Sequence, residues 1–114
     1  FGFSLTLNNG KKLTFLGDEP YNPVCEKYVR DCDWLLHEAF CLYVERDLWK
    51  PYEKHHSTVK DACELAQAMQ IPNLVLWHTE DSNVAGRERL YKSEGKKYYG
   101  GNIFVPDDES LIAL

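Results

Sequence analysis

The sequence predicts an α/β fold in which a mixed sheet is covered by helices on one face. Apolar segments of strand character alternate with helical segments after an opening hairpin, which is the pattern of a sheet with helical connections. The chain has 114 residues, and these do not supply a second layer for the other face of such a sheet. We therefore expect that the second face is apolar and that the chain is half of a larger architecture.

The first two strands form a predicted hairpin. Residues 1–7 alternate apolar and polar side chains, which is typical of a strand with one buried face. The turn Asn8-Asn9-Gly10-Lys11 follows, and its Asn-Gly pair is expected to supply the positive φ values of a tight turn. Residues 12–16 make the return strand, which ends at the loop 17–20.

The middle of the chain contains a short helix, a buried strand and a longer helix. The short helix is expected over 23–30 and the strand over 34–36, and the segment from there to Tyr52 has no clear assignment. Thr58 is the predicted N-cap of the longer helix, and Asp61 completes an approximate capping box.

The last part of the chain continues the alternation. A second buried strand is expected over 73–77, and a helix over 83–93 with Ser82 or Asn83 at its start. Terminal strands are expected at 103–105 and 111–114, around a turn at 106–109.

Composition excludes several classes of protein. No apolar run approaches the roughly 18 residues of a membrane span, and no basic segment followed by an apolar one marks a signal peptide. We therefore expect a cytoplasmic protein whose four cysteines, none in a CxxC pair, are reduced core thiols. The net charge of −5 argues mildly against nucleic acid as a partner of the whole surface. The start without Met favours a segment of a longer protein.

Two residues at predicted strand ends are candidate metal ligands. Asp18 follows a glycine at the end of the return strand, where a carboxylate can bridge two cations. His78 directly follows the most apolar strand, and its imidazole could bind zinc. The alternative for Asp18 is a turn aspartate that bonds its own backbone. The alternative for His78 is a half-buried histidine hydrogen-bonded to a neighbouring carbonyl.

Two further residues are candidates for acid–base chemistry. His56 stands just before the capped helix, where it could act as a general acid or hold an oxyanion. A plain loop histidine is the alternative. Glu38 could orient such a histidine through a carboxylate–imidazole bond. His37 points the other way by strand alternation, so a structural role is expected for it.

Taken in order, these segments resemble the C-terminal half of the metallo-β-lactamase superfamily, and within it the ribonuclease Z branch. The resemblance covers nearly the whole chain. It lies in Leu16-Gly17-Asp18-Glu19-Pro20, Leu35-Leu36-His37-Glu38-Ala39-Phe40, His56-Ser57-Thr58, Leu74-Val75-Leu76-Trp77-His78 and Gly101-Asn102-Ile103-Phe104-Val105-Pro106-Asp107-Asp108.

The resemblance implies a role for each candidate residue. Asp18 would bridge two zinc ions and His78 would be the last histidine ligand, whereas Glu38 and His56 would assist proton transfer to the leaving oxygen. Phe40 stands where the family has Thr, and an additional His55 precedes His56. The register with Ser57-Thr58 favours His56 as the acting imidazole.

The resemblance also implies that part of the active site is missing. The family's His-x-His-x-Asp-His motif lies in its N-terminal half, and no such string occurs here. Residues 1–114 would then form the C-terminal half of a four-layer αββα sandwich, with the N-terminal half as its partner. A catalytic zinc needs about three protein ligands, so this polypeptide alone should bind zinc poorly and be inactive.

The implied function is a metal-dependent hydrolase, specifically a phosphodiesterase or a tRNA 3′-end endoribonuclease. Members of the family often form homodimers, and the resemblance allows that assembly. One alternative is hydrolysis of a small phosphodiester, thioester or lactone by the same fold. Others are a non-catalytic module that completes another chain's sheet, and an unrelated α/β domain.

Overall fold

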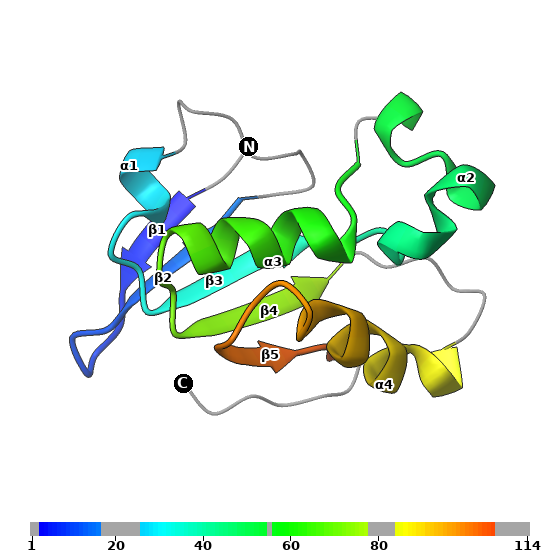
Figure 1. Ribbon diagram of the computed structural model, residues 1–114. Helices are drawn as coiled ribbons and strands as arrows, with labels where there is room; N and C mark the ends of the chain where they lie inside the picture. The colour runs from blue at the N-terminus through cyan, green and yellow to red at the C-terminus, as the bar shows by residue number, and fades with distance from the viewer. Residues whose placement is uncertain (1–2, 17–25, 55, 78–83, 107–114) are drawn as a thin grey trace.

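The computed structural model describes residues 3–16, 26–54, 56–77 and 84–106. These residues contain one mixed sheet with the strand order β1-β2-β3-β4-β5 (Figure 1). The hairpin strands β1 and β2 are antiparallel, and β2 through β5 run parallel to one another. The mixed sheet expected from the sequence is therefore confirmed. Its strands are β1 (Phe3–Thr6), β2 (Lys12–Phe15), β3 (Trp34–Glu38), β4 (Asn73–Trp77) and β5 (Asn102–Phe104).

The longer helices lie on one face of the sheet, as Figure 1 shows for α3 and α4. Leu35, Leu74 and Leu76 of the strands form one core cluster with Val59 of α3 and Tyr91 of α4. Within the described ranges, no helix has the length and apolar character needed to cross a bilayer. The helices are α1 (Glu26–Val29), η2 (Tyr43–Glu45), α2 (Arg46–Trp49), η3 (Tyr52–Lys54), α3 (Val59–Ala68) and α4 (Val84–Gly95).

The opposite face of the sheet is apolar and rich in aromatic rings. Side chains alternate along a strand, so Trp34 points away from the helix-covered face that carries Leu35. Trp34 and Val75 belong to a second, separate core cluster, and the Trp34 ring lies 5.3 Å from the ring of Phe104. This second apolar face agrees with the expectation from the sequence.

The hairpin turn forms where predicted, but its backbone differs from the expectation. Leu7 N–H donates to Lys11 O at 2.7 Å and Gly10 N–H donates to Leu7 O at 2.9 Å. Only Gly10 has a positive φ in this turn (85°), so the expected positive φ at Asn9 was wrong. The loop contains three residues, and such loops place only the last one in the left-handed region.

Several element boundaries differ from the predicted ones. The buried strand predicted over 34–36 continues to Glu38, because the ladder with β4 extends to the pair Glu38–Trp77. The helix predicted over 23–30 spans only one turn in the described residues. The unassigned segment before Tyr52 contains η2 and α2, and the last helix ends at Gly95 rather than near Ser93. The strand expected at 111–114 lies outside the described residues.

Gly95 ends α4 at a point of close packing. A Cβ atom added there would lie 2.7 Å from Ile103 Cδ1 and 2.9 Å from Cys63 Sγ. Both contacts are shorter than van der Waals separation, and both neighbours are buried. Only a residue without a side chain therefore lets α4 approach α3 and β5 at this point.

We predict that Gly95→Ala lowers the free energy of unfolding by about 1–3 kcal/mol, because the added methyl group overpacks the core. Urea denaturation measures the change. Gly100→Ala is the matched control, since the nearest described atom to its Cβ would be Gln67 Oε1 at 3.9 Å. Equal effects of the two substitutions would contradict the packing role of Gly95.

Candidate active site

The carboxyl ends of the parallel strands meet at one edge of the sheet, which is where ligands bind in open α/β sheets. Phe15 at the end of β2 and Trp77 at the end of β4 have ring centroids 4.9 Å apart, although β3 lies between their strands. Asp18 and His78 follow these strands but lie outside the described residues. In the sheet, β3 lies between the two strands that precede them.

Glu38 and His56 come together at this edge. Glu38 is the last residue of β3, and its side chain has no exposed surface. His56 Nδ1 contacts Glu38 Oε1, and 22% of the His56 side chain is exposed. A buried carboxylate is costly unless a charged or hydrogen-bonding group pairs with it. The imidazole supplies such a partner and reaches the surface of the protein.

The backbone before α3 is held in a fixed register beside the end of β3. Phe40 N–H donates to Ser57 O at 2.9 Å, and Val59 N–H donates to Cys41 O at 3.1 Å. Cys41 and Thr58 form a parallel bridge between these two bonds. The His56 N–H donates to Pro51 O at 2.8 Å. His56 therefore has a defined position relative to Glu38.

A capping box fixes the start of α3. The Thr58 N–H donates to Asp61 Oδ2 at 2.8 Å, and the Asp61 N–H donates to Thr58 Oγ1 at 3.4 Å. This arrangement satisfies N–H groups that would otherwise lack partners at the helix start. The predicted capping box is confirmed, and it anchors the chain two residues after His56.

His37 faces away from Glu38 along the strand and has a different environment. It is 1% exposed, and its Nδ1 donates a hydrogen bond of 2.7 Å to the Glu38 carbonyl oxygen. Burial lowers the pKa of His37 from its usual value of 6.5, so the ring stays neutral in the folded protein. This environment agrees with the structural role expected for His37.

The three described cysteines are unsuited to nucleophilic chemistry. Cys32, Cys41 and Cys63 are buried, and none of the three is in a disulfide. Burial raises the pKa of Cys32 to about 11 and that of Cys63 to about 12, so both stay protonated near neutral pH. The expectation of reduced core thiols holds for these three, and Cys25 lies outside the described residues.

The site also depends on residues that the sequence did not reveal. Glu94 of α4 is 5% exposed, and its carboxylate accepts hydrogen bonds from the Tyr43 N–H at 2.6 Å and the Val44 N–H at 3.3 Å. Tyr91 Oη donates to Phe40 O at 3.1 Å. The only signal in the sequence was the i, i+3 spacing of Tyr91 and Glu94, which places both on one helix face. These bonds attach α4 to the segment that follows β3.

The described residues do not form a metal centre by themselves. Among them, no group of three or more His, Cys, Asp or Glu side chains could hold a metal ion. Glu38 and His56, which lie at the expected edge, contact each other. The expected ligands Asp18 and His78 are not described.

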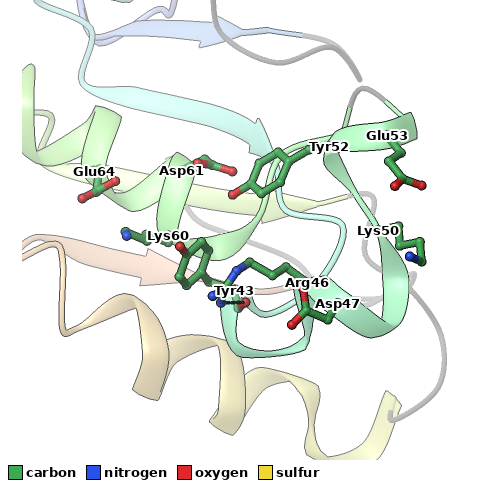
Figure 2. A pocket seen from close by; sticks show the side chains of 9 residues that line it. All are labelled: Tyr43, Arg46, Asp47, Lys50, Tyr52, Glu53, Lys60, Asp61 and Glu64. Atoms are coloured by element: carbon green, nitrogen blue, oxygen red, sulfur yellow. Dashed lines mark hydrogen bonds between the residues drawn. The ribbon is translucent and has the colours of Figure 1, made fainter.

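A hollow of about 670 Å³ lies between the segment 43–53 and the start of α3 (Figure 2). Cations contact the Tyr43 ring, with the Arg46 guanidinium 4.0 Å and Lys60 Nζ 4.2 Å from its centroid. Acidic side chains face the same hollow, and the mixed charge favours no single class of ionic ligand. The lining residues are Tyr43, Arg46, Asp47, Lys50, Tyr52, Glu53, Lys60, Asp61 and Glu64.

Comparison with solved structures identifies the fold. The metallo-β-lactamase fold protein YhfI from Bacillus subtilis matches 89% of this chain with a TM-score of 0.70 and 16% sequence identity, over 39% of its own length. The short form of human tRNase Z matches 99% of the chain with a TM-score of 0.71 and 26% identity, over 38% of its own length. The chain therefore has the metallo-β-lactamase fold, and the interpretation as an unrelated α/β domain is excluded.

Sequence comparison places the chain within this fold. No family model matches it. A ribonuclease Z from Ligilactobacillus salivarius is 31% identical over 90% of the chain and 32% of its own length. A ribonuclease Z from Pyrobaculum arsenaticum is 34% identical over 91% of the chain and 36% of its own length. The chain is thus similar in sequence to ribonuclease Z, and it spans about a third of the length of these curated relatives.

We predict that acid destabilises the fold through His37. The unfolded chain binds a proton at His37 as the pH falls through the usual pKa of 6.5, whereas burial lowers the pKa in the folded chain, which therefore binds the proton only at lower pH. The free energy of unfolding should therefore fall as the pH falls from 7 to 5, with a slope of up to about 1.4 kcal/mol per pH unit from this residue. Urea denaturation at a series of pH values measures the slope.

His37→Asn is the matched variant, since its amide can donate to the same carbonyl without titrating. We expect a shallower dependence between pH 7 and 5 and an unchanged dependence between pH 8 and 7. Identical profiles for both proteins would show that His37 does not contribute.

Proposed function

We propose that this chain supplies the C-terminal half of a metal-dependent phosphodiesterase of the ribonuclease Z type, which cleaves the 3′ end of precursor tRNA. One observation carries the proposal. A fully buried carboxylate at a strand end contacts the imidazole of a partly exposed histidine, at the edge of a metallo-β-lactamase-fold sheet. Curated relatives named ribonuclease Z support the class of substrate.

In this proposal His56 is the general acid and Glu38 orients it. The Glu38 carboxylate holds the Nδ1 side of the ring, which fixes the orientation of the imidazole. The acidic proton is then on Nε2, from which it passes to the oxygen that leaves phosphorus. Proton transfer of this kind contributes roughly 10²–10⁴-fold to the rate of an enzyme.

We also propose that Asp18 and His78 are ligands of a divalent metal centre, with zinc as the expected ion. Asp18 is three residues beyond Phe15 and His78 directly follows Trp77, and the rings of Phe15 and Trp77 are 4.9 Å apart. This short spacing in the chain supports a shared metal centre near this edge. A bound metal pair would lower the pKa of water and supply the nucleophile.

The remaining ligands and the second sheet would come from polypeptide outside these 114 residues. The apolar face around Trp34, Val75 and Phe104 suits packing against another sheet, since sheets stack about 10 Å apart through interdigitating side chains. The three buried cysteines outside disulfides are compatible with the reducing cytoplasm, which is the compartment we propose.

A small phosphodiester is the second candidate substrate, and the net charge of −5 favours it. An assay of the full-length protein against a 3′-extended tRNA and a chromogenic phosphodiester separates the two. Contacts to RNA phosphates make binding steeply dependent on salt, so the salt dependence of KM is a second criterion.

We predict that His56→Ala in the full-length protein lowers kcat by about 10²–10⁴-fold at unchanged metal content, because only the proton donor is removed. Turnover of 3′-extended tRNA and elemental analysis of the purified protein measure the two quantities.

His55→Ala is the control and should retain near wild-type turnover. Loss of metal in His56→Ala would make His56 a ligand instead of an acid. Equal losses of turnover in both variants would contradict the assignment to His56.

We predict that the isolated 114-residue chain binds zinc weakly and is inactive, because a catalytic zinc needs about three protein ligands. Calorimetric titration with zinc measures binding to the isolated chain. In the full-length protein, Asp18→Ala and His78→Ala should each reduce the metal content. Tight binding of two zinc ions by the isolated chain would refute the proposal that some of the metal ligands come from polypeptide outside these 114 residues.

A further inference from the structure

The imidazole of His56 has an aromatic ring on one face. The Phe40 ring stacks on it with centroids 4.7 Å apart and an interplanar angle of 16°. Phe40 is two residues beyond Glu38, so the same short segment contributes the carboxylate at Nδ1 and the ring on the face of His56. The ribonuclease Z pattern that this segment resembles has Thr at this position, and Thr cannot stack.

Phe40 is itself held by three separate parts of the structure. Its N–H donates to Ser57 O at 2.9 Å, and its carbonyl oxygen accepts from Tyr91 Oη of α4 at 3.1 Å. The Trp49 ring of α2 lies edge-on to Phe40, with a centroid distance of 6.3 Å and an interplanar angle of 89°. The Phe40 ring therefore has a fixed position when it meets the imidazole.

We propose that Phe40 is a positioning residue for His56, a role that rests on the proposed function of His56 as the general acid. The carboxylate at Nδ1 fixes one edge of the imidazole, and a flat ring on its face prevents rotation out of that plane. The two contacts together hold the ring in the orientation from which Nε2 can deliver a proton. Phe40 does not touch the substrate in this role.

Two titratable side chains contact the stacked pair: Glu38 contacts His56 Nδ1, and Tyr91 Oη of α4 donates to the Phe40 carbonyl oxygen. Neither side chain changes when the Phe40 ring is removed. A substitution at position 40 therefore tests the stack and leaves these groups in place.

The experiment compares Phe40→Leu with Phe40→Tyr in the full-length protein. Phe40→Leu removes the ring, and we expect kcat on 3′-extended tRNA to fall about tenfold with KM within about twofold of wild type, since a small displacement of a catalytic group is enough to slow the reaction. Phe40→Tyr keeps the stack and should retain wild-type kcat. Phe104→Leu is the matched control, because it truncates a ring on the apolar sheet face.

Nuclear magnetic resonance supplies a readout that does not depend on activity. The Phe40 ring current should shift the His56 ring protons upfield, and Phe40→Leu should remove that shift, whereas Phe40→Tyr and Phe104→Leu should preserve it. The His56 signals are assigned by their absence in His56→Ala. Phe40→Met replaces Phe40→Leu if circular dichroism shows that the leucine variant does not fold.

The positioning role is overturned if Phe40→Leu keeps wild-type kcat, if the His56 protons do not move, or if a folded Phe40→Tyr loses as much activity as Phe40→Leu. The proposed function is tested separately, by His56→Ala. Wild-type turnover in His56→Ala would refute the role of His56 as the acid, whereas loss of turnover in His56→Ala with normal turnover in Phe40→Leu would refute only the positioning role.

Discussion

The contact between a fully buried carboxylate and a partly exposed imidazole sets the requirements for the rest of the site. Glu38 lies at the end of a central strand, where water does not reach it, and an ionised group in that position needs a compensating partner. His56 can be the partner of the Glu38 carboxylate only if the backbone before α3 is held beside the end of β3. The parallel bridge at Cys41 and Thr58, the bond from His56 to Pro51 and the capping box together provide that register.

Features set by neighbouring residues could be predicted from the sequence. The capping box of Thr58 and Asp61 spans three residues, and the apolar runs that become β3 and β4 are short and continuous, so local pattern was sufficient. The turn at Gly10 was located correctly, but the backbone of Asn9 was not, because the same Asn-Gly pair occurs in loops of different length.

Features that depend on distant residues could not be predicted. Glu94 binds backbone groups that are about 50 residues earlier in the chain, and a glutamate on a helix normally indicates a solvent-exposed face. The extension of β3 to Glu38 required its pairing with Trp77. The pairing of Glu38 with His56 was proposed from a family resemblance and from the chemistry of the two groups. Their spacing in the sequence does not indicate a contact.

The order of the strands in the sheet follows the order of the strands in the chain, from β1 to β5. Each described strand after β1 therefore pairs with the strand that precedes it in the chain. The described sheet can grow one strand at a time from its amino-terminal hairpin, because each added strand finds its partner already made. A segment with this topology can begin to assemble while it is still emerging from the ribosome.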